Sequence, residues 1–247
     1  MTVFCNQSVL WTSGNEDYHT YRIPALIVTP AGTVLAFCEG RRNSSSDTGD
    51  IDMLVKRSTD GGRSWSNHEM VWADGENTCG NPCAVVDRET GDIWLLMTHN
   101  LGTDREAQII DQTSEGARTV WVVVSKDDGR SWSTPYEITS TTKRPDWTWF
   151  ATGPGHGIQL KSGRLVIGCN HVVMENGRQH IADQENVLSD PYHSHVIYSD
   201  DHGKMWQLGG SAGRFNGESQ ALQRADGSIY LNARTSGKGP QVRSVID

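Results

Sequence analysis

Short apolar runs alternate with turn residues along the whole chain. Runs of about four to eight residues bounded by Gly, Asp, Ser or Pro indicate β-strands rather than helices. No long amphipathic helix is evident, so the pattern predicts an all-β fold. The candidate strands are residues 33–39, 52–56, 84–87, 93–98, 119–124, 165–169, 195–198 and 228–232.

One turn pattern, Ser-x-Asp-x-Gly-x-x-Trp, occurs at residues 58–65, 125–132 and 199–206. Each copy follows a predicted strand. The Asp can cap backbone N–H groups of the turn, the Gly accepts a positive φ, and the Trp packs on the sheet. The spacing of about 70 residues leaves room for four short strands, which is typical of a β-propeller blade. We therefore expect Asp60, Asp127 and Asp201 to be structural.

Composition narrows the class of partner. The chain is 36% hydrophobic and 21% charged, and its net charge is −8. Without a dense Lys/Arg run, an acidic chain argues against nucleic acid as a partner. No apolar run is long enough to cross a membrane, so no membrane partner is expected. The first residues do not resemble a signal peptide, which leaves the compartment open.

The potential metal ligands show no metal-binding spacing. The five cysteines are scattered, and we interpret them as free, partly buried thiols, a weak indication of a reducing compartment. Of the nine histidines, His193 and His195 share one face of a strand and are expected to be solvated or hydrogen-bonded. We expect no metal and no cofactor.

Three further segments carry candidate chemistry. Arg22-Ile23-Pro24 precedes an apolar run, residues 37–50 contain Glu39, Arg41 and Asp47, and residues 216–234 contain Glu218 and Asn232-Ala233-Arg234. Together with the three turn repeats, these segments resemble the sialidase (neuraminidase) family over essentially the whole chain. The resemblance implies one β-propeller domain over residues 1–247, truncated at its C-terminus. It further implies about four blades of a six-bladed propeller.

The resemblance also implies roles for individual residues. Arg22 and Arg234 match two of the three arginines that bind the sialic acid carboxylate, and Arg41 matches an arginine that contacts a ring substituent. Asp47 matches the general acid/base, and Glu218 the base that activates a tyrosine nucleophile. Asn81 is expected to line the pocket, although a simple turn role before Pro82 is an equal alternative. Arg42 is expected to be solvated, and Asp50 and Asp52 structural.

These residue types suit an acidic sugar. Arg binds a carboxylate through a planar fork of donors, and a neutral Tyr nucleophile avoids repulsion from that carboxylate. The implied function is an exo-α-sialidase that hydrolyses terminal sialic acid from glycoconjugates with retention. Its Tyr and third Arg would lie beyond this fragment, so we expect the fragment alone to be inactive.

Two other functions remain open: a non-catalytic propeller for glycan or protein binding, and a hydrolase or transferase acting on another acidic sugar. Four aromatic residues fit either a sugar site or core packing: Tyr18, Tyr21, Trp147 and Trp149.

Overall fold

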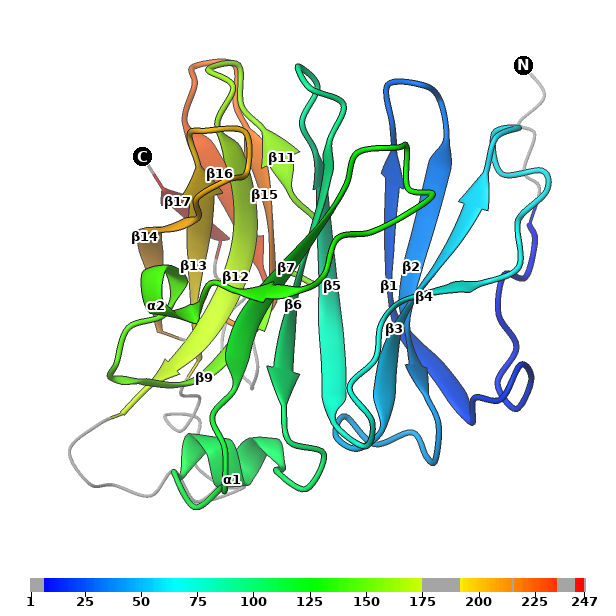
Figure 1. The fold of residues 1–247 in the computed structure, drawn as a ribbon. Coiled ribbons are helices and arrows are strands. Elements are labelled where there is room, and N and C mark those ends of the chain that lie inside the picture. The colour runs from blue at the N-terminus through cyan, green and yellow to red at the C-terminus, as the bar shows by residue number, and fades with distance from the viewer. Residues whose placement is uncertain (1–6, 175–191, 215, 235–242, 247) are drawn as a thin grey trace.

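A computed structural model of the chain describes residues 7–174, 192–214, 216–234 and 243–246. Its strands form three sheets that divide into four blade-like units (Figure 1). The first unit contains β1 (Thr20–Val28), β2 (Val34–Arg41), β3 (Ile51–Ser58) and β4 (Glu69–Trp72). The second contains β5 (Thr78–Val86), β6 (Ile93–Asn100), β7 (Thr119–Ser125) and β8 (Tyr136–Glu137).

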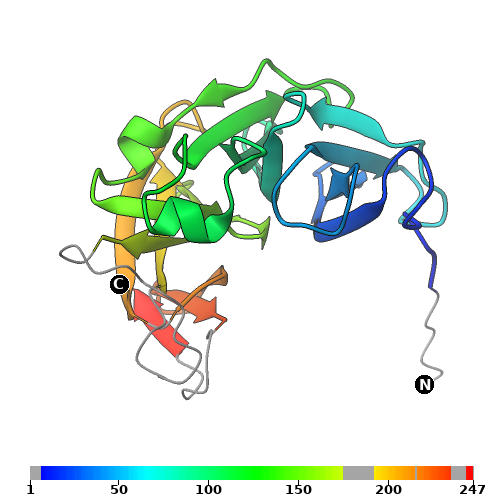
Figure 2. The same ribbon diagram turned by 90° about the horizontal axis from the view of Figure 1, so that it is seen from below.

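The third unit contains β9 (Trp147–Thr152), β11 (Ile158–Gln159), β12 (Leu165–Val173), β13 (Tyr192–Ser199) and β14 (Gln207–Arg214). The fourth contains β15 (Ser219–Gln223), β16 (Ile229–Ala233) and β17 (Arg243–Ile246), while β10 (Gly155–His156) pairs in parallel with β5. Two short helices, α1 (Glu106–Ile110) and α2 (Thr139–Thr142), lie in connections. Figure 2 shows the units following one another around an open arc. The all-β prediction is confirmed, and the chain forms an open part of a β-propeller.

Each predicted strand is present, although its ends shift by a few residues. The run predicted at 33–39 is β2, which continues to Arg41, and nearly every residue of β2 is buried. A strand covered on both faces does not alternate between polar and apolar positions, so the pattern alone marks its ends poorly.

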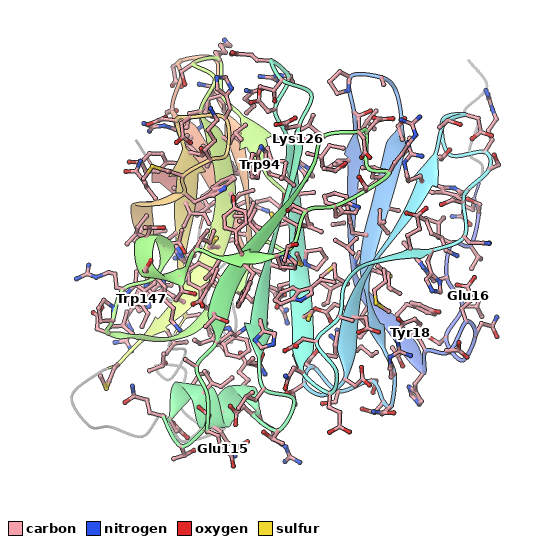
Figure 3. All side chains as sticks on the ribbon, in the orientation of Figure 1. Glu16, Tyr18, Trp94, Glu115, Lys126 and Trp147 are labelled. Atoms are coloured by element: carbon pink, nitrogen blue, oxygen red, sulfur yellow. The ribbon has the colours of Figure 1, made fainter. Side chains whose placement is uncertain are left out.

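The turn repeats are built as predicted. Asp60 accepts hydrogen bonds from the backbone N–H groups of Arg63 and Ser64 at 3.0 and 2.9 Å. Asp127 caps its own turn in the same way, and hydrogen bonds, first among them the one from the Ser131 hydroxyl, lower the pKa of Asp127 to about 2. Lys126, beside Asp127, lies near the end of the sheets opposite Glu115 and α1 (Figure 3). These carboxylates therefore serve the turns.

The repeats also join neighbouring blades. The residue that follows the repeat's Asp has a positive φ in the second and third copies, 63° at Asp128 and 61° at His202. Asp128 accepts hydrogen bonds from the hydroxyls of Thr29 (2.6 Å) and Thr33 (2.5 Å) in the first blade. His202 Nδ1 lies 2.7 Å from an oxygen of Asp87 in the second blade. Each of these turns thus fixes its blade to the preceding one.

A buried histidine pair lies in the third blade. His171 Nδ1 and His195 Nδ1 are 2.9 Å apart, so one ring must donate and the other accept. Both residues are at most 2% exposed, and the His171 ring stacks on Trp147 at a centroid distance of 3.4 Å. Burial, reinforced by the charge of His193, lowers the pKa of His171 to about 3, and burial also lowers the pKa of His195. The pair is therefore neutral in the folded protein.

Acid is expected to destabilise the fold through this pair. Because the folded pKa of His171 lies below the ordinary value of 6.5, its stabilising contribution is complete above pH 6.5 and is lost as the pH falls toward 3. The free energy of unfolding should fall by about 2 kcal/mol for His171 between pH 6.5 and 5. Urea denaturation at several pH values measures this slope. A His171→Phe variant should have a shallower slope, and equal slopes would contradict the assignment.

Candidate active site

A cavity of about 340 Å³ opens between the blades, and Glu106, the first residue of α1, is among its lining residues. Strand ends and loops from all four blades supply its walls. All six predicted site residues line it: Arg22, Arg41, Asp47, Asn81, Glu218 and Arg234. Residues up to 212 positions apart in the sequence (234 − 22) are thus brought to one hollow.

An irregularity in β1 presents Arg22 to the cavity. The register with β2 shifts between Arg22 and Ala25, and Ile23 has a φ of 55°, a strained value for a β-branched residue. Such strain at a bulge is a common way to redirect a side chain. Arg22 Nη1 lies 3.1 Å from Asp47 Oδ1, and both side chains remain exposed, by 47% and 70%. The two groups are therefore accessible to a ligand.

Arg41 is held in place by the buried carboxylate of Glu39. Its Nε and Nη2 donate to Glu39 Oε2 at 3.0 and 2.6 Å, and Nη2 also lies 2.8 Å from Asp47 Oδ1. Nη1 donates to the Ser45 carbonyl at 2.7 Å. Glu39 Oε1 in turn accepts the Asn81 N–H at 2.8 Å. Arg41 thus fixes the loop that carries Asp47, and contact of Arg41 with a ring substituent stays a prediction.

Glu218 and Arg234 form the opposite wall. Arg234 Nη1 donates to Glu218 Oε2 at 2.7 Å, and this bond is the main cause of the raised pKa of Arg234. Backbone bonds join Arg234 N–H to Glu218 C=O (2.7 Å) and Gly217 N–H to Arg234 C=O (2.8 Å). The β15–β16 hairpin therefore delivers an acid and a guanidinium as one unit.

Arg118 is a cavity residue that the sequence interpretation missed. It is 3% exposed, and among the described residues its hydrogen-bond acceptors are neutral oxygens, including the Phe150 carbonyl and the Asn81 side chain. Its guanidinium lies 4.1 Å from the Trp149 ring centroid. Burial lowers the pKa of Arg118 to about 10. Arg118 orients the amide of Asn81, and an isolated Arg before a strand gave no motif by which to find it.

Glu106 and Tyr192 were also missed. Tyr192 donates its hydroxyl to Glu106 Oε1 at 2.5 Å, and both line the cavity. Glu106 begins α1, whereas Tyr192 begins β13, so only folding makes them neighbours. Trp149 lines the cavity as well, whereas Tyr18 and Trp147 are buried in packing clusters.

The cavity can hold an acidic sugar and supply proton transfer. Its lining residues include four arginines and four carboxylates: Arg22, Arg41, Arg118 and Arg234, and Glu39, Asp47, Glu106 and Glu218. The exposed guanidiniums suit an anionic ligand, and carboxylates of this kind can exchange protons with a bound ligand.

The described residues also bear on the expectations for metal ligands, cysteines and membrane spans. No group of three or more His, Cys, Asp or Glu side chains in them could hold a metal ion. Cys38, Cys79, Cys83 and Cys169 are free, as predicted, but they are fully buried and not partly so, while Cys5 lies outside the described residues. No helix in the described part of the chain is long and apolar enough to cross a membrane.

Known proteins resemble this chain over most of its length. Residues 32–246 match the BNR repeat-like domain family. An exo-alpha-sialidase of Aspergillus fumigatus is 33% identical over 239 residues, which cover 90% of this chain and 53% of that protein. Human Sialidase-4 is 34% identical over 229 residues, covering 87% and 46%. The chain thus spans about half the length of the curated relatives it matches.

Solved sialidase structures have a similar fold. The Hadza microbial sialidase Hz136 superposes with a TM-score of 0.79 at 30% identity, covering 94% of this chain and 45% of that one. Trypanosoma rangeli sialidase superposes with a TM-score of 0.70 at 20% identity, covering 92% and 38%, a likeness of fold alone.

Proposed function

Because the chain belongs to the sialidase superfamily of glycoside hydrolases, we propose that its cavity is the site of an exo-α-sialidase acting on sialylated glycans. One observation carries the proposal: Arg22, Asp47 and the Glu218–Arg234 pair come from three separate segments and line a single cavity. A module that only binds glycans needs the arginines but not the two acids. The acids therefore favour hydrolysis.

In this proposal, Arg22 and Arg234 bind the carboxylate on the anomeric carbon. Asp47 protonates the leaving oxygen and later activates water, as a general acid/base. Glu218 takes the proton of a tyrosine nucleophile in a retaining reaction, as sialidases use Tyr where most glycosidases use a carboxylate. Asn81 presents its amide to the bound sugar from the cavity floor, held there by Arg118.

Hydrolysis of a fluorogenic α-sialoside by the protein expressed from the full open reading frame, here called the full-length protein, tests the function. We expect release from the sialoside and none from the matching glucuronide, which is also acidic but carries its carboxylate away from the anomeric carbon. Faster release from the glucuronide would overturn the substrate class. No release from either would overturn the enzyme assignment.

The 247-residue chain alone is expected to release no fluorophore under the same conditions. The blades follow one another only along an open arc (Figure 2), and none of the site residues assigned above is the proposed tyrosine nucleophile. A transition state that is contacted by only part of the active site loses most of its stabilisation. Ready turnover by the purified chain would show that these residues suffice.

A further inference from the structure

Arg42 is not the solvated neighbour of Arg41 that the sequence suggested. Its side chain is 34% exposed, and its Nη2 lies 2.7 Å from Asp52 Oδ2. Nε donates to the same oxygen at 3.0 Å, and the guanidinium lies 4.7 Å from the centroid of the Tyr18 ring. The sequence interpretation was wrong because Asp52 and Tyr18, the groups that hold Arg42, are brought to it by sheet pairing and by the preceding loop.

The partners of Arg42 are themselves buried. The Asp52 side chain is 2% exposed and Tyr18 is 3% exposed. The Tyr18 hydroxyl donates to Asp52 Oδ2 at 2.7 Å. Removing either partner of a buried carboxylate leaves its charge poorly compensated and costs considerable stability. The three side chains therefore behave as one unit. Figure 3 places Tyr18 in the lower half of the first blade.

This unit joins the two segments that supply Arg22 and Asp47. Tyr18 lies near the end of the loop before β1, four residues ahead of Arg22 (22 − 18). Arg42 begins the loop that carries Asp47, and its N–H donates to the Asp50 carbonyl at 3.1 Å, which closes that loop. His19 N–H donates to the Arg42 carbonyl at 3.3 Å, a second link between the segments.

We propose that Tyr18, Arg42 and Asp52 form a clamp that positions Asp47 relative to Arg22 for protonation of the leaving group. The proposal rests on the proposed sialidase function. None of the three residues lines the cavity, so they act through Asp47 as positioning residues. Asp47 is 70% exposed on its loop and depends on such supports for its place. Arg41 supports the loop from the cavity side, and the clamp supports it from the outer side.

The chain offers a matched control on another blade. Arg164 donates to Asp200 through Nε (2.7 Å) and Nη2 (2.8 Å), and its guanidinium lies 4.2 Å from the Tyr198 ring centroid. This cluster has the same three residue types, but it lies in the third blade and does not line the cavity. Its removal should change activity only through general stability.

The test compares Arg42→Gln, Tyr18→Phe and Arg164→Gln in the full-length protein, well below each melting temperature. For the two clamp variants, kcat/KM on a sialyllactose, which has a poor leaving group, should fall about 10-fold. On an aryl sialoside with a good leaving group it should fall less than about twofold, because that group needs little protonation. Arg164→Gln should leave both values near wild type. Equal losses on both substrates, or no loss, would overturn the clamp.

Hydrogen exchange of the backbone amides of residues 43–49 gives a second readout that needs no activity. The clamp predicts faster exchange in Arg42→Gln and unchanged exchange in Arg164→Gln. Unchanged exchange in Arg42→Gln would overturn the clamp even in an active enzyme. Faster exchange in a full-length protein that cleaves no sialoside would support the clamp as a loop anchor and overturn the proposed function alone.

Discussion

Asp47→Asn in the full-length protein is expected to lower kcat/KM on sialyllactose by about 10²- to 10⁴-fold, the range for removal of a general acid. The replacement preserves size, and its amide oxygen can still accept hydrogen bonds from Arg22 and Arg41, which reach Asp47 Oδ1 at 3.1 and 2.8 Å. Protonation of the leaving oxygen is therefore the main function lost.

The leaving group distinguishes this role from a structural one. An aryl sialoside departs with little protonation, so Asp47→Asn should cost it no more than about 10-fold in kcat/KM. Asp50→Asn is the matched control, since Asp50 lies on the same loop 3.4 Å from Arg42 but does not line the cavity. That variant should remain close to wild type on both substrates. If Asp47→Asn impaired both substrates equally, Asp47 would have to be assigned to binding instead.

Glu39→Leu is expected to lower the free energy of unfolding by about 3–5 kcal/mol, the usual result of breaking a buried ion pair. The side chains of Glu39 and Arg41 are only 4% and 3% exposed. Without Glu39, the Arg41 guanidinium loses its buried counter-charge, and the Asn81 N–H loses its acceptor. The exposed Asp47 offers only partial compensation. Urea denaturation of the full-length protein, with an unchanged m-value, measures the loss.

A double variant distinguishes loss of the Glu39–Arg41 charge pair from loss of packing around Glu39. Glu39→Leu with Arg41→Met removes both charges, so it should regain most of the stability that Glu39→Leu loses. Arg22→Met is the surface control: its ion pair with Asp47 is exposed, and its loss should change the free energy of unfolding by at most about 1 kcal/mol. A double variant no more stable than Glu39→Leu alone would show that packing around Glu39, and not charge, is responsible.

Much of the active-site composition was predictable because the relevant signals are local in sequence. The three repeats, with their capping Asp and Trp, predicted sheet units and structural roles for Asp60 and Asp127, and both roles are confirmed. The motif residues around Arg22, Asp47 and Glu218 were likewise recognisable within short segments, and the structure brings them to one cavity. Their catalytic roles remain predictions.

Only the tertiary structure decided which residues outside the sequence motifs also line the cavity. Arg118 precedes a strand as many surface arginines do, yet it is buried behind Asn81 because β7 lies beside β6, and its neighbours come from β5 and β9. Glu106 and Tyr192 are 86 residues apart and meet only because α1 lies under the third blade. Such contacts leave no periodic or turn signal in the chain.

The sequence by itself therefore determined the turns, the strands and the motif-bearing loops, since each depends on the φ preferences and hydrogen bonds of adjacent residues. The arrangement of blades determined burial, and with it the charge pairing of Arg41, the neutrality of the His171–His195 pair and the confinement of Arg42. Removal from water is what makes a charge or a ring nitrogen depend on a specific partner, and that removal is a property of the assembled sheets.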